Sequence, residues 1–102
     1  MKVINFNQPI KTLDGAAMKK DKDQDLMIKE LVANSLCVAK AKKSDNVVRQ
    51  LNLALSIYNS KEPVNVEDAD IKIIKEILAD ADFSTLVLGQ MIKVIDEAET
   101  VK

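Results

Sequence analysis

Four successive segments of the chain place apolar residues at intervals of three and four, the spacing that gives a helix one apolar face. We expect these helices at about 26–42, 46–59, 67–81 and 84–98. Polar or proline-containing stretches separate them, so the helices must fold back on one another to bury their apolar faces. A chain of 102 residues can bury one modest core. We therefore predict a single domain over 1–102, with a four-helix bundle over 25–98.

Residues 2–18 have a pattern typical of β-structure instead. β-Branched and aromatic residues occur over 3–6, and apolar and polar residues alternate over 10–13. Asp14-Gly15 follows, the strongest short hairpin signal, and we expect a type I′ turn there. An isolated hairpin is marginally stable in water, so it must pack on the helices. Residues 64–66 also alternate and predict a short strand. The predicted fold class is α+β, mostly α, with an N-terminal β-hairpin packed on a four-helix domain.

The centres of the four apolar faces predict the core. For the second helix, the expected inward face comprises Val47, Val48, Leu51, Ala54, Leu55 and Tyr58. The most central core residues over all four helices are expected to be Leu31, Leu51, Leu55, Ile74, Ile77, Met91 and Ile95. On this prediction, Leu51→Ala would cost roughly 2–5 kcal/mol of stability. Gly89 lies inside the fourth helix, where glycine is unfavourable, and it suggests a close crossing with a neighbouring helix.

Several apolar residues lie off these inward faces. They are Leu53, Ile57, Ile73, Leu88 and Val94. A small chain can bury only part of its apolar surface, so these residues either face a second side of the bundle or form an interface with another molecule. Residues 1–59 contain ten basic and six acidic residues, whereas residues 60–102 contain five and ten. Oppositely charged halves can attract each other within one chain or between copies. We predict a homo-oligomer, with the five apolar residues as its candidate interface.

The composition leaves little material for catalysis or metal binding. The sequence has no histidine and one cysteine, Cys37, which we expect to be buried mid-helix and unreactive. The acidic stretch 21–25 resembles the start of a calcium loop. That loop would need a glycine where Leu26 stands and a glutamate where Val32 stands, so it could not close around the ion. The acidic residues around the third helix are explained by its dipole. We predict no enzyme, no cofactor and no metal.

A basic cluster is the remaining candidate for ligand binding. It comprises Lys40, Lys42, Lys43 and Arg49, which could hold a small anionic ligand. A net charge of −1 and only three aromatic residues argue against nucleic-acid binding. The sequence has no apolar run long enough to span a membrane and no signal-peptide pattern. A single unpaired cysteine fits a reducing compartment, and we expect the cytoplasm.

The segments INFNQPIKTLDGAAM, LNLALSIYN, VNVEDADIKIIKEIL and LVLGQMIKVID together resemble a group of small accessory proteins encoded by tailed phages and prophages. The resemblance covers most of residues 3–97 and rests on fold signatures, so it implies no catalytic residues. It implies a viral product made in the cytoplasm of a host bacterium. We favour an accessory protein that acts by protein–protein binding and inhibits a host protein. The alternatives are a homo-oligomeric sponge for an anionic signalling nucleotide and a virion assembly factor.

Overall fold

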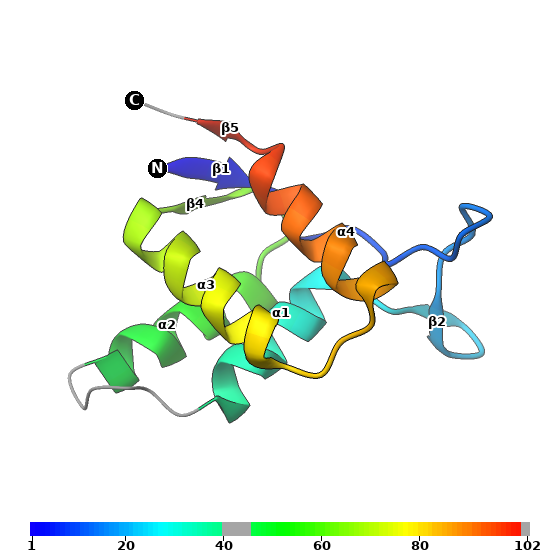
Figure 1. The fold of residues 1–102 in the computed structure, drawn as a ribbon, viewed down its shortest axis with the longest axis horizontal. Helices are drawn as coiled ribbons and strands as arrows, with labels where there is room; N and C mark the ends of the chain where they lie inside the picture. The colour runs from blue at the N-terminus through cyan, green and yellow to red at the C-terminus, as the bar shows by residue number, and fades with distance from the viewer. Residues whose placement is uncertain (40–45, 101–102) are drawn as a thin grey trace.

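The computed structural model describes residues 1–39 and 46–100. Its elements, in chain order, are β1 (Lys2–Ile4), β2 (Lys19–Asp21), β3 (Gln24–Asp25), α1 (Ile28–Val38), α2 (Asn46–Tyr58), β4 (Val64–Val66), α3 (Asp68–Asp80), α4 (Thr85–Asp96) and β5 (Glu99–Thr100). The four helices form the body, with a small sheet at one end and a hairpin arm at the other (Figure 1). The predicted α+β class, mostly α, is confirmed.

The first strand lies in the middle of a three-stranded sheet of order β4-β1-β5. Both pairings are antiparallel, and Lys2 lies opposite Val66 on one side and Thr100 on the other. The predicted strand at 64–66 is therefore confirmed. The Lys2 ammonium group also donates hydrogen bonds of 3.1 Å to the carbonyls of Ile95 and Asp96, at the end of α4. The sheet thus holds the start of the chain against its last helix.

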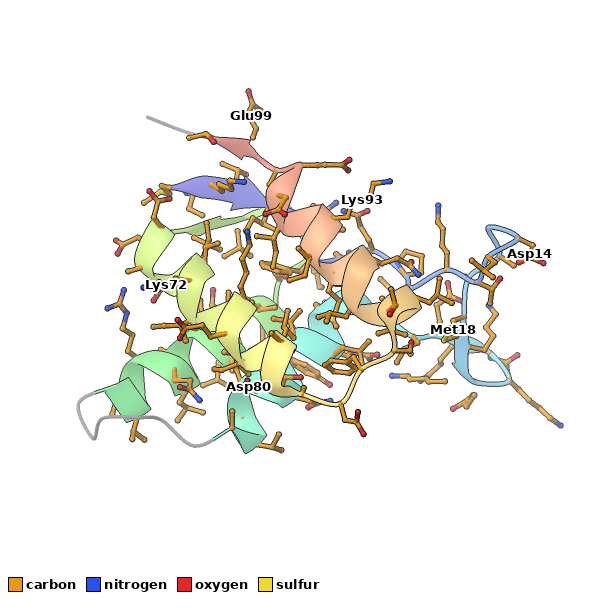
Figure 2. All side chains as sticks on the ribbon, in the orientation of Figure 1. Asp14, Met18, Lys72, Asp80, Lys93 and Glu99 are labelled. Atoms are coloured by element: carbon orange, nitrogen blue, oxygen red, sulfur yellow. The ribbon has the colours of Figure 1, made fainter. Side chains whose placement is uncertain are left out.

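Residues 9–27, here called the arm, form two successive hairpins that project from the helices, one closed by the bridge between Lys11 and Ala17 and the other made of β2 and β3 (Figure 1). Its strands are joined by backbone hydrogen bonds from Ile10 to Leu26, from Met18 to Ile10 and from Leu26 to Met18, at 2.7–2.8 Å. Ile10 is fully buried at the base, and Met18, labelled in Figure 2, packs against the core. The polar segment that follows, residues 19–25, forms the second hairpin, β2–β3.

The arm also shifts the start of α1 from the predicted Leu26 to Ile28. Asp25, which directly precedes the predicted helix, is paired in β3. The first free N–H groups of α1 donate instead to carbonyls of the preceding chain, from Ile28 to Gln8 at 2.8 Å and from Lys29 to Phe6 at 3.0 Å. These donors have no partner within the helix, so the contacts satisfy them. The contacts also join the start of α1, where the arm ends, to the residues just before the arm begins.

The predicted hairpin turn is present, but its type is different. Lys11 pairs with Ala17, and Thr12 N–H donates to Ala16 at 2.8 Å. Gly15 has a φ of +89°, whereas no described residue other than glycine has a positive φ, so Asp14 cannot occupy the type I′ conformation. The connection matches a three-residue loop with glycine in the left-handed position. The Asp14 carboxylate accepts the Thr12 hydroxyl hydrogen, which lowers the pKa of Asp14.

We predict that Gly15→Val destabilises the protein by about 1 kcal/mol or more, because a β-branched residue is strained at positive φ. The matched control is Gly89→Ala. Gly89 is exposed and nothing would lie within 4 Å of an added Cβ, so the expected close helix crossing is wrong. Alanine there should be neutral or stabilising by up to about 1 kcal/mol. Urea unfolding measures both, and an unchanged midpoint for Gly15→Val would contradict the strained turn.

The buried apolar side chains form one cluster that draws on the sheet, the arm and all four helices. It comprises Ile4, Phe6, Ile10, Ile28, Val32, Ala33, Leu36, Ala54, Ile57, Val66, Ile71, Ile74, Leu78, Met91 and Ile95. Of the predicted core, Ile74, Met91 and Ile95 are confirmed, and Leu31 and Ile77 pack partly buried against the cluster. The predicted core positions of Leu51 and Leu55 are wrong, because both side chains are 48% exposed.

Helix α2 is therefore rotated relative to the prediction. Ala54 and Ile57 point into the core, and Ile57 is completely buried. The prediction that Ile57 belongs to an external interface is wrong for this reason. Leu51, Leu55 and Tyr58, expected inside, lie on the surface.

The rotation reverses the effect expected for Leu51→Ala and makes Ile57 the sensitive position instead. Ile57→Ala should destabilise the protein by about 2–5 kcal/mol, because it opens a cavity in the core. Leu51→Ala should change stability by less than about 1 kcal/mol, since the side chain is half exposed and alanine favours a helix. Urea unfolding at low protein concentration, where self-association contributes least, compares the two. A larger loss for Leu51→Ala than for Ile57→Ala would show that the helix faces the other way.

Candidate interaction surface on helix α2

An apolar stripe runs along the exposed side of α2. It consists of Val48, Leu51, Leu55 and Tyr58, here called the α2 seam, with Val47 beside it. These five side chains are between 48% and 65% exposed. The seam residues are spaced three, four and three apart, so they share one helix face. Large apolar residues gathered on one exposed helix face are typical of a binding surface.

Gln50 explains why the more apolar face of α2 points outward. Its side-chain amide donates hydrogen bonds to the carbonyls of Leu36 at 2.7 Å and Ala39 at 2.9 Å, at the end of α1. Carbonyls at a helix end lack partners within the helix, and leaving them unpaired in a buried place is costly. Gln50 is itself buried in making these contacts. Ala54 and Ile57, one and two turns further along, consequently face the core.

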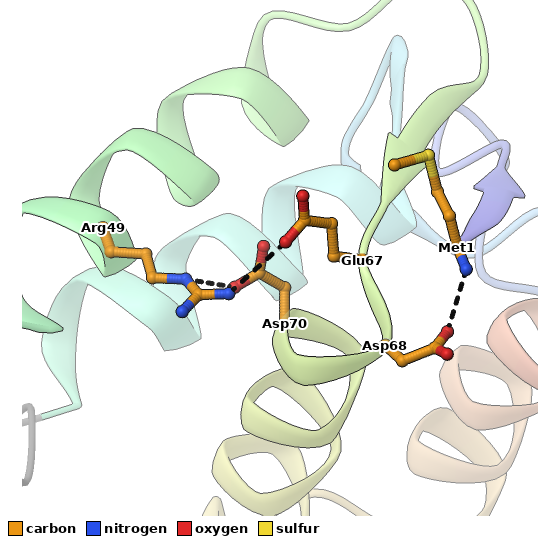
Figure 3. A network of polar contacts seen from close by, with 5 residues as sticks. All are labelled: Met1, Arg49, Glu67, Asp68 and Asp70. Atoms are coloured by element: carbon orange, nitrogen blue, oxygen red, sulfur yellow. Dashed lines mark hydrogen bonds and ion pairs between the residues drawn. The ribbon is translucent and has the colours of Figure 1, made fainter.

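Arg49 joins α2 to the start of α3. Its Nε donates to Asp70 Oδ1 at 2.7 Å, and its Nη2 lies 3.8 Å from Glu67 Oε2 (Figure 3). Beside this group, the N-terminal ammonium of Met1 pairs with Asp68 at 3.1 Å. Arg49, predicted to bind an anion, is thus already held by two carboxylates.

The other predicted site residues are scattered. Lys40, Lys42 and Lys43 lie outside the described residues. Of the predicted interface, Leu53, Leu88 and Val94 are partly buried against the core, and Ile73 is partly buried as well. The structure therefore does not gather the predicted interface into one exposed patch.

The outer surface of α2 differs from those of its neighbours. Exposed lysines occur on α3 and α4, for example Lys72 and Lys93 (Figure 2). Within α2, Arg49 is the only Lys, Arg, Asp or Glu. This scarcity of charge was the available signal that both faces of the helix are apolar enough to be buried. The prediction placed the more apolar face, with Leu51 and Leu55, in the core. The structure instead buries the less apolar face, with Ala54 and Ile57.

Cys37 is exposed rather than buried, because it lies on the solvent side of the last turn of α1, whereas Val32, Ser35 and Leu36 face inward. Within residues 1–39 and 46–100, no three His, Cys, Asp or Glu side chains gather in a way that could hold a metal ion. In the same ranges, no helix combines the length and apolar character needed to cross a membrane.

The displaced pKa values belong to surface contacts. Lys20 donates to Glu30 at 2.6 Å, which raises the pKa of Lys20 and lowers that of Glu30. A hydrogen bond from Lys75 likewise lowers the pKa of Asp96. Each shift has its cause in one neighbouring partner, as in ordinary structural ion pairs.

Comparisons of the chain with protein-family models, with curated proteins and with solved structures find no match. The α2 seam is therefore identified from its own geometry and chemistry.

We predict that Gln50→Met destabilises the protein by about 1–3 kcal/mol, because it keeps the length of the side chain but removes both N–H donors to α1. Asn52→Met is the matched control, since Asn52 is exposed on the same helix and should change stability by no more than about 0.5 kcal/mol. Urea unfolding measures both variants. Equal midpoints for the two would mean that the Gln50 contacts do not hold α2 in place.

Proposed function

We propose that this protein is a non-enzymatic accessory protein that acts by binding another protein through the α2 seam. The observation that carries the proposal is the exposed row of Val48, Leu51, Leu55 and Tyr58 on a helix whose opposite side is already packed. With Val47, these side chains leave on the order of 500 Å² of mostly apolar surface open, at the upper end of what an isolated small protein exposes in one patch.

The physical basis for binding is removal of this surface from water. Apolar burial contributes about 25 cal/mol per Å², and no charge along the seam would have to be desolvated at the same time. Arg49 lies off the seam and is occupied by Asp70 and Glu67. An apolar helix face without charges favours another apolar surface, such as a helix or groove of a partner protein.

Two features support a non-enzymatic role. The chain has no histidine, the commonest general base. Among residues 1–39 and 46–100, the displaced pKa values are those of Asp14, Lys20, Glu30 and Asp96, and each is explained first by its hydrogen-bonding partner. None of these shifts comes from a pair of acids held in contrasting environments, the arrangement that would suggest acid–base catalysis. The resemblance to small phage proteins supports the cytoplasm of an infected bacterium as the setting and a host protein as the target.

The test uses the full chain with three forms: wild type, Leu55→Asp in the seam, and Ser56→Asp as a matched control on an exposed position outside it. Each form is used to capture proteins from a bacterial lysate, and any captured protein is then purified and titrated directly by calorimetry. We expect Leu55→Asp to weaken binding at least about tenfold, whereas Ser56→Asp binds like wild type. Circular dichroism checks that both variants keep their helices. Equal binding by wild type and Leu55→Asp would contradict the proposal.

A further inference from the structure

We infer that the α2 seam binds the α2 seam of a second copy of this chain, with the two helices antiparallel across a two-fold axis. The inference rests on the proposed function, since it concerns the same surface, and it names the partner that the surface fits best. A target protein that uses the seam would have to compete with this self-association.

The spacing of the seam is the first support. Intervals of three, four and three match two heptads of a coiled-coil seam, and they read the same in both directions along the helix. In an antiparallel pair centred on Leu53, Leu51 lies opposite Leu55 of the second copy, and Val48 lies opposite its Tyr58. The two outer layers then pair a large side chain with a small one and the two inner layers pair leucine with leucine, which spreads the bulk evenly along the interface. A parallel pair would instead place the two tyrosines together and the two valines together.

The charges favour a second copy over a charged partner. Within α2, no charged residue belongs to the seam, so two identical faces meet without like-charge repulsion. Asn52 and Ser56, exposed on α2 beyond the seam, are uncharged as well, so they add no like-charge repulsion beside it.

The position and area of the seam fit a weak, reversible dimer. Helix α2 packs mainly on α1 and lies at the edge of the molecule, where a second copy has access to it (Figure 1). Two patches on the order of 500 Å² bury about 1,000 Å² in total, the lower end of specific interfaces. The dimer should therefore form at high micromolar concentration and dissociate on dilution.

Light scattering after size exclusion, over about a hundredfold range of concentration, tests the self-association. Wild type and Ser56→Asp should rise from the chain mass of 11.3 kDa towards twice that value, and the rise should survive high salt, because apolar burial is not screened. Leu55→Asp should stay at the chain mass throughout. If Leu55→Asp fails to fold by circular dichroism, Tyr58→Asp at the end of the helix takes its place.

Cross-linking tests the antiparallel arrangement. In a Cys37→Ser background, chains with Val48→Cys are mixed with chains with Tyr58→Cys under mild oxidation. We expect disulfide-linked pairs in the mixture and little cross-linking of either chain alone, since position 48 faces position 58 of the second copy. Cross-linking of each chain with itself would overturn the antiparallel arrangement.

Wild-type protein that remains at the chain mass at every concentration would overturn the inference. The proposed function would then be judged separately, by whether a captured protein is lost with Leu55→Asp and kept with Ser56→Asp. A dimer that persists in Leu55→Asp would equally overturn the inference, because it would use another surface.

Discussion

The two hydrogen bonds from the Gln50 amide to the end of α1 fix which face of α2 lies against its neighbour. They set the rotation of α2 about its own axis. Once Gln50 faces α1, Ile57 must enter the core, and Arg49 is placed beside the first turn of α3. The same rotation leaves the α2 seam outside. One buried polar group thus decides both the packing of the second helix and the character of the surface.

Ion pairs at one place join the basic half of the chain to the acidic half. Arg49 pairs with Asp70, and the N-terminal ammonium of Met1 pairs with Asp68, so residues from the basic half contact the acidic half directly. These contacts bridge α2 and the start of β1 to α3 (Figure 3). Since exposed ion pairs contribute little stability, their main effect is to fix how α2 and the start of β1 are oriented relative to α3. They also leave apolar contact as the main force available to the seam for binding another molecule.

The arrangement of α2 has a physical cost that a binding role would explain. Gln50 is buried while Leu51 and Leu55 remain half exposed, although an isolated monomer would gain by burying leucine. A second molecule that covers the seam would remove this exposed surface from water, and the proposed antiparallel dimer does so with no charge to desolvate. The arm ends in another exposed leucine, Leu13, at the tip of its hairpin turn.

The sequence alone determined the features that depend on neighbouring residues. The four helices, the strand at 64–66 and the turn at Asp14-Gly15 follow from periodicity and turn chemistry within a few positions. It also identified five apolar residues off the predicted inward faces, but it left open whether a second side of the bundle or another molecule covers them. The tertiary structure decided which face of α2 is covered and which strands flank β1, because those choices depend on the end of α1 and on strands some 60 and 95 positions away. Two faces of α2 were apolar enough to be buried, and the structure buries the one that brings Gln50 to the carbonyls at the end of α1.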